Sequence, residues 1–175
     1  MIELTLDQFL QVLPELIAKR WDEEKLFTRP KTPILYYSNQ GDANLDYVRE
    51  YNIPIYAFNR IGGSVVSFPG DIGIAYITNK TGVPVEVQKL THYLVSKNLN
   101  VTIHNNDVLV DGYKVISYDT NEIGDNYRLV VVQISINLDI ELIKQICLKI
   151  MIKTPKALSD FGVTTEQVMQ VLNIE

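Results

Sequence analysis

Apolar and polar residues alternate at short intervals along much of the chain, and this period of two predicts β-strands. Gly, Pro, Asn and Asp, which favour turns, separate the apolar runs. The expected strands cover residues 34–37, 53–58, 65–68, 72–77, 101–104, 108–110, 113–117 and 128–138. We expect residues 65–68 and 72–77 to form a hairpin around Pro69-Gly70, and the strands on either side of Asp111-Gly112 to form another.

A helical spacing of three and four residues interrupts this pattern in five places. The expected helices cover residues 5–17, 42–51, 84–98, 140–150 and 165–172. In the third helix Pro84 suits the first turn, and Val87, Leu90, Leu94 and Val95 should face inward. Short hairpin-linked strands with interspersed helices predict an α+β domain with a mostly antiparallel mixed sheet and helices packed on it.

Composition places the chain among ordinary globular proteins. Its 175 residues are 46% hydrophobic and 21% charged, enough for one domain with its own core. The net charge of −5 gives no general electrostatic reason for binding nucleic acid. The N-terminus lacks the basic segment of a signal peptide, and no window reaches the length of a membrane span. We expect a single cytoplasmic domain covering residues 1–175, with no membrane or nucleic-acid partner.

Few residues suggest metal or thiol chemistry. His92 and His104 are isolated in sequence and make no ligand set, so no metal site is expected. The single Cys147 excludes an internal disulfide, and its apolar surroundings indicate a packing residue rather than a nucleophile.

The strongest candidate for chemistry is the hairpin of residues 105–117. It presents Lys114 behind the Asp111-Gly112 turn, with Asn106 and Asp107 at the entrance of the preceding strand. A lysine held on a rigid hairpin suits an anionic ligand because its ammonium is a compact point charge with three donors. A surface hairpin with a solvated lysine is the alternative interpretation.

A second candidate segment covers residues 53–71. A predicted strand leads into Arg60, then Gly62 and Gly63, and then the β-branched Val65-Val66. Paired glycines often form only a turn. Beside an arginine they can also form a backbone cradle for a carboxylate or phosphate.

Together the two segments resemble the lipoate and biotin protein ligases and the octanoyltransferases. The Asn-Asp pair, the Gly-x-Lys and the β-branched residue after it are similar to the family's lysine motif, and residues 53–71 resemble its Arg- and Gly-rich loop. Residues 156–168 are similar to the end of the lipoate ligase large domain, and the match covers residues 33–172. The resemblance implies the family's class II synthetase-like catalytic domain, without the accessory C-terminal domain.

The resemblance also implies chemistry. Lys114 would be the catalytic residue, neutralising a carboxylate and phosphoryl oxygens. The implied cofactor-binding residues are Arg60, Gly62, Gly63, Ser64, Ser67, Asp71, Asn106 and Asp107. ATP and Mg²⁺ are the implied cofactors. The implied partners are a small carboxylic acid, such as lipoate or octanoate, or its adenylate, and an acceptor protein domain bearing a lysine.

Several positions depart from the family pattern. Phe58 and Asn59 stand where the family has paired arginines, Ser67 stands where it has a histidine, and Tyr118 lies where it has small residues. Because Phe58 and Tyr118 are bulky, we expect a narrower acyl site than a lipoyl group requires. Three hypotheses remain open: an active ligase or acyltransferase, a catalytically degenerate domain that binds a small ligand or a protein, and an unrelated small α+β protein.

Overall fold

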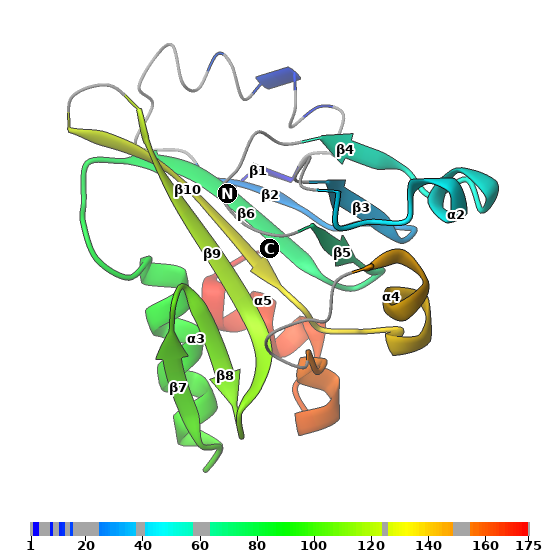
Figure 1. The fold of residues 1–175 in the computed structure, drawn as a ribbon. Coiled ribbons are helices and arrows are strands. Elements are labelled where there is room, and N and C mark those ends of the chain that lie inside the picture. Colours follow the sequence, from blue (N-terminus) through cyan, green and yellow to red (C-terminus); the bar gives the residue numbers. More distant parts are fainter. Residues whose placement is uncertain are drawn as a thin grey trace.

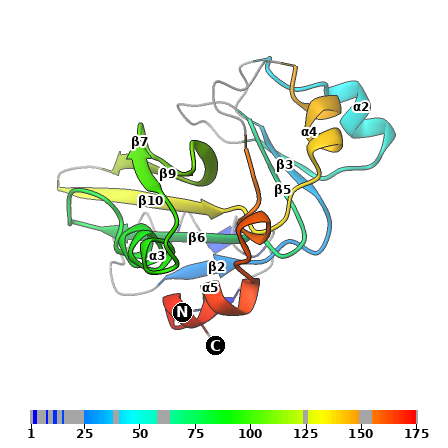
Figure 2. The same ribbon diagram turned by 90° about the horizontal axis from the view of Figure 1, so that it is seen from below.

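The computed structural model describes residues 2–3, 8, 11–12, 15, 25–37, 41–57, 64–123, 126–148 and 155–174. Within these ranges the protein is built in layers (Figures 1 and 2). Two helices cover one face of a large sheet, a smaller sheet lies against part of its other face, and two further helices cover the far side of the smaller sheet. The predicted α+β architecture with a mixed, mostly antiparallel sheet is confirmed.

The large sheet has seven strands among the described residues. In spatial order they are β1 (Ile2–Glu3), β2 (Leu26–Thr28), β6 (Ile72–Thr78), β10 (Tyr127–Ile134), β9 (Tyr113–Ile123), β8 (Asp107–Val110) and β7 (Val101–His104). Every pairing is antiparallel except that of β1 with β2. One face, here called the helix face, packs against α3 (Val85–Ser96) and α5 (Thr165–Leu172) and forms the main core.

The opposite face of this sheet, here called the inner face, looks towards the smaller sheet. That sheet consists of β4 (Ile55–Ala57), β3 (Ile34–Tyr37) and β5 (Val65–Ser67), with β3 in the middle. Because side chains alternate along β3, Ile34 packs against the inner face while Leu35 packs against α2 (Leu45–Glu50) and α4 (Ile140–Ile146).

The predicted hairpin of residues 65–68 and 72–77 is wrong. β5 pairs with β3 in the small sheet, whereas β6 pairs with β2 and β10 in the large one. The chain changes sheets at the Pro69-Gly70 turn, where the buried Asp71 carboxylate accepts a hydrogen bond from the Phe68 amide at 2.8 Å. A turn signal in the sequence marks a change of direction, but it does not specify which strand becomes the neighbour.

Other predictions hold with corrected boundaries. In α3, Val87, Leu90 and Leu94 are fully buried, but Val95 is 51% exposed because it lies one helical step, about 100°, beyond Leu94. The helix expected from residue 42 begins only at Leu45, since Asn44 caps it by accepting a hydrogen bond from the Tyr47 amide. α4 ends at Ile146, and β9 extends to Ile123. Of the helix expected at residues 5–17, only residues 8, 11, 12 and 15 are described, and these are helical.

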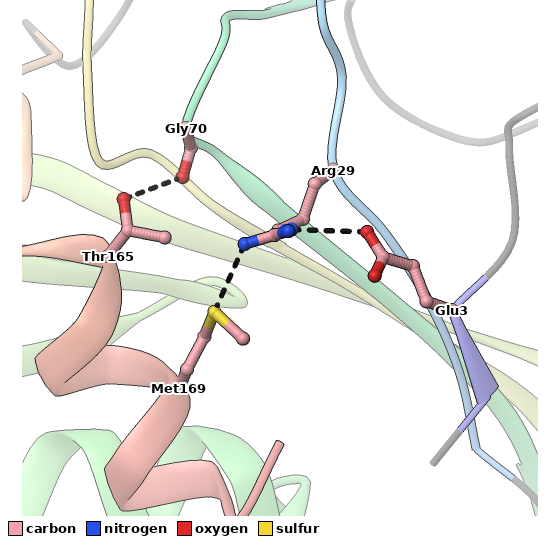
Figure 3. Close-up of polar contacts among 5 residues, drawn as sticks. All are labelled: Glu3, Arg29, Gly70, Thr165 and Met169. Atoms are coloured by element: carbon pink, nitrogen blue, oxygen red, sulfur yellow. Dashed lines mark hydrogen bonds and ion pairs between the residues drawn. The ribbon is translucent and has the colours of Figure 1, made fainter. Parts of the chain in front are cut away.

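The C-terminal helix α5 is tied to the large sheet and to the turn between the sheets (Figure 3). The Thr165 hydroxyl donates to the Gly70 carbonyl at 3.2 Å, and the Arg29 guanidinium contacts the Met169 sulfur at 3.4 Å and the Glu3 carboxylate at 3.1 Å. These contacts hold α5 against the turn that precedes Asp71 and against the end of β2.

Candidate functional site

The hairpin that carries Lys114 forms as the sequence predicts. Asp111 and Gly112 adopt φ values of 50° and 83°, and Asn105 and Asn106 at the preceding turn adopt 48° and 63°. Positive φ at both central residues is the geometry of tight hairpin turns, and Asn, Asp and Gly tolerate it best. Both ends of β8 are therefore fixed by local backbone chemistry.

A β-bulge within this hairpin decides which way Lys114 points. Val108 pairs with Ile116 but Leu109 pairs with Lys114, so Val115 is an extra residue in β9. Val115 and Ile116 consequently both enter the core on the helix face. Strict alternation would have placed Lys114 on the same face as Ile116. The bulge instead places Lys114 on the inner face of the sheet.

On the inner face Lys114 meets one of its two predicted partners. Its ammonium lies 3.0 Å from the Asp107 carboxylate, and the two side chains are 31% and 16% exposed. Asn106 is exposed at the tip of the turn, and its carbonyl accepts a hydrogen bond from the Tyr118 amide at 2.9 Å. Lys114 and Asp107 thus form a half-buried ion pair at one side of the inner face.

A transverse row of small and polar residues crosses the inner face from this ion pair. Asp107 pairs with Ser117, Ser117 with Gln133, Gln133 with Gly73, and Gly73 with Thr28. Four strand spacings make the row about 19 Å long. The next row on the same face holds Val131, Ala75 and Leu26 and is mostly apolar. Sequence analysis did not identify Ser117, Gln133 or Thr28, because strand patterns give a residue's face but not its neighbours across strands.

The small sheet touches this row through Ser67. The Gln133 amide donates to the Ser67 hydroxyl at 2.8 Å, and that hydroxyl lies 3.3 Å from the Asp71 carboxylate. Ser67 and Asp71 are both completely buried. Ser67 therefore bridges the two sheets at the middle of the row.

Asp71 holds the main chain of two segments together. Its oxygens accept hydrogen bonds from the amides of Phe68, Ile136 and Asn137, at 2.8, 2.7 and 3.1 Å, in addition to the contact with Ser67. Burial raises the pKa of the Asp71 carboxyl to about 6, against the opposing effect of these hydrogen bonds. In this structure the carboxylate fixes the turn between the sheets; its predicted contact with a cofactor stays a prediction.

Ser64, the first described residue after the glycine pair, is anchored by a carboxylate that sequence analysis did not select. Its amide and hydroxyl both donate to the buried Asp42 carboxylate at 2.6 Å. Burial raises the pKa of the nearby Cys147 thiol, and the charge of Asp42 raises it further. A raised pKa keeps the thiol protonated and unreactive, in agreement with the packing role expected for Cys147.

Arg60, Gly62 and Gly63, like Phe58 and Asn59, lie outside the described residues. Tyr118 belongs to the core on the helix face, on the other side of the sheet from Lys114, and its expected narrowing of an acyl site stays a prediction. The side chains next to it in β9, Ser117 and Asp119, face inward instead.

No group of three or more metal-ligating side chains occurs among the described residues. No helix in the described part of the chain is long and apolar enough to cross a membrane.

Comparison with solved structures identifies the fold. The chain is similar to P. falciparum LipL1 in complex with lipoate, with a TM-score of 0.78 and 15% identity over 98% of this chain and 56% of that one. It is similar to lipoate-protein ligase A bound with ATP, with a TM-score of 0.70 and 14% identity over 98% of this chain and 81% of that one. A biotin protein ligase from Aquifex aeolicus in complex with biotin gives a TM-score of 0.51 and 14% identity over 99% of this chain and 66% of that one.

These likenesses establish the fold as that of the lipoate and biotin protein ligases. The chain spans a little over half the length of the P. falciparum protein. No protein-family model matches the sequence. No curated protein matches it by sequence search. At this level of identity the structural match shows the fold alone.

Proposed function

We propose that this protein acylates a lysine of an acceptor protein with a small carboxylic acid of the lipoate or octanoate type. It would either activate the acid itself or transfer the acyl group from an activated donor. The observation that carries the proposal is the bulge at Val115, which turns Lys114 to the inner face of a ligase fold. A hairpin that only displayed a lysine to solvent would need no bulge. Here the bulge places the ammonium beside Asp107, at one end of the row that leads to Thr28.

The chemistry of Lys114 fits an anionic reacting group. Its three donors can neutralise a carboxylate and the phosphoryl oxygens next to it, while Asp107 orients the ammonium. Ser117, opposite Asp107, offers a hydroxyl that can donate to or accept from the ligand. ATP, when bound here, would supply the adenylyl group that makes the acid's carbonyl reactive towards an amine.

The carboxylates on the inner face suit a Mg²⁺ ion held jointly with a nucleotide better than a metal ion held by protein side chains alone. Mg²⁺ commonly binds through one or two carboxylates together with substrate phosphates. Asp107 and Asp119, both of which face inward, are the carboxylates on this part of β8 and β9 that suit that role. The predicted contributions of Arg60, Gly62 and Gly63 belong to the same proposal.

A second candidate function is a non-enzymatic domain of the same fold that binds a small ligand or a protein. It is favoured by Ser67 and Asp71, two predicted ligand-binding residues that are fully buried and hydrogen-bonded to each other and to the surrounding structure. The two candidates differ in one property, which is turnover.

An acid-dependent exchange of radiolabelled pyrophosphate into ATP, with lipoate, octanoate and biotin, tests the proposal. Calorimetric titration with the same acids, with and without ATP and Mg²⁺, measures binding separately. Lys114→Met should lower exchange by about a hundredfold or more, the usual effect of removing one preorganised donor from a transition state. Lys89→Met, an exposed lysine on α3, is the matched control.

The outcomes separate the candidates. Exchange that depends on Lys114 and not on Lys89 supports the ligase. Binding of an acid without exchange, and without acyl transfer from an octanoyl thioester, favours the binding domain. Undiminished exchange in Lys114→Met would remove Lys114 from the mechanism.

A further inference from the structure

We propose that Lys156 is a positioning residue for Lys114, holding its main chain from the side opposite β8. The inference rests on the proposed function in one respect: Lys114 is taken as the ligand-binding cation. Lys156 belongs to a short segment, residues 155–157, that lies far along the chain from the hairpin.

The main chain shows why this segment matters. β10 accompanies β9 only as far as the pairing of Ile134 with Ile116, followed by a hydrogen bond from the Ser135 amide to the Val115 carbonyl at 3.0 Å. At Lys114 the neighbour is Pro155, in a parallel bridge. In this parallel pairing the donor is the residue after Pro155, and the Lys156 amide lies 3.0 Å from the Lys114 carbonyl.

The side chain of Lys156 holds the residue before Lys114 from the helix face of the sheet. Its ammonium lies 3.9 Å from the ring centre of Tyr113 and 5.5 Å from that of Phe161. Tyr113 directly precedes Lys114 and pairs with Val110, whose side chain is in the core on the helix face. The two lysine ammonium groups therefore lie on opposite sides of the sheet, and Lys156 holds the residue next to Lys114 by cation–π attraction.

The segment can transmit this constraint because it is itself firmly held. Leu158 is fully buried, and its amide donates to the Ser135 carbonyl at 2.9 Å. The Ser159 amide donates to the Ile136 carbonyl at 3.1 Å. Figure 2 shows the segment (orange) rising from the short helix Leu158–Phe161 towards the curled start of β9.

Positioning is needed because of the bulge. A shift of one residue in the pairing of β9 would return Lys114 to the helix face, and bulged strands lack the ladder bond that would resist such a shift. With β8 on one side and Lys156 on the other, the main chain of Lys114 has one register. We therefore expect Lys156 to determine how much of the time Lys114 faces Asp107.

Nitrogen-15 NMR of the lysine side chains tests this without any activity. The Lys114 signal is assigned with Lys114→Arg, and Asp107→Asn gives its position when the ion pair is absent. In Lys156→Met we expect the Lys114 signal to move towards the Asp107→Asn position and the main-chain amide at position 156 to exchange with solvent about tenfold faster. Lys156→Arg, which keeps the cation over the rings, should restore both.

The matched control is Lys97→Met. Lys97 makes the same kind of contact, 5.4 Å from the ring centre of Tyr93, but at the end of α3. Should Lys156→Met not fold, Tyr113→Leu removes the nearer of the two ring contacts while leaving Lys156 in place. A Lys114 signal that stays unchanged in the folded variants, or that moves equally in Lys97→Met, overturns the proposal.

Calorimetric titration of lipoate and of octanoate, each with ATP and Mg²⁺, separates this proposal from the proposed function. An affinity about tenfold weaker in Lys156→Met and normal in Lys156→Arg supports both. A shifted Lys114 signal with no binding to any form supports the positioning and contradicts the function. Binding that is equally tight in wild type and Lys156→Met overturns the positioning and leaves the function standing.

Discussion

Asp71 is the carboxylate on which burial and hydrogen bonding act in opposite directions, and its replacement by asparagine measures which prevails. Burial disfavours the charged form, whereas three backbone amides and the Ser67 hydroxyl favour it. Burial has the larger effect, and the pKa of the Asp71 carboxyl is therefore raised to about 6. The amide introduced by Asp71→Asn keeps one carbonyl acceptor and cannot titrate.

The sign of the effect follows from the two states. The folded pKa of about 6 lies above the unfolded value of about 3.9, so the folded protein binds the proton more tightly. The stabilisation is fully present below the unfolded pKa and is lost as the pH rises through 6. Two pKa units correspond to about 3 kcal/mol in total, and about 1 kcal/mol of this falls between pH 7 and pH 5.

Urea unfolding followed by far-ultraviolet circular dichroism, at pH 7, 6 and 5, is the assay. The free energy of unfolding of the wild type, minus that of Asp71→Asn, should become more positive by about 1 kcal/mol on going from pH 7 to pH 5. Asp111→Asn, at an exposed turn that asparagine also favours, corrects for the general loss of one negative charge. A difference that becomes more negative as the pH falls would show that the hydrogen bonds prevail, and the reasoning from burial would be refuted.

Two further predictions concern the transverse row and the ion pair at its end. Gly73→Ala should lower the free energy of unfolding in urea by about 1–3 kcal/mol, because the new Cβ would lie 2.6 Å from the Thr28 hydroxyl. This loss should be smaller in a Thr28→Ala background, and an equal loss in both backgrounds would contradict the prediction. A double-mutant cycle of Lys114→Met and Asp107→Asn should give a coupling energy of about 0.5–1 kcal/mol, as expected for a partly exposed ion pair. A coupling energy near zero would show that this contact at 3.0 Å does not contribute to stability.

The sequence determined those features that depend on local backbone preferences. Asp111-Gly112 and Asn105-Asn106 form tight turns because these residue types tolerate positive φ, and this fixes the hairpin whatever surrounds it. Val87, Leu90 and Leu94 mark the buried side of α3 by their spacing alone. The resemblance to the ligases, which rests on the order of two motifs, predicted the fold that the structural comparisons then showed.

Tertiary structure alone decided how these elements meet. The side of the sheet on which Lys114 lies depends on one extra residue, Val115, and on Lys156 some forty residues further along the chain. The separation of β5 and β6 into different sheets depends on a buried carboxylate, Asp71, that accepts hydrogen bonds from an amide of its own turn and from the distant residues 136–137. Alternation in a strand states which residues share a face, but strand register and neighbours are set by long-range packing and hydrogen bonds, which a local pattern does not encode.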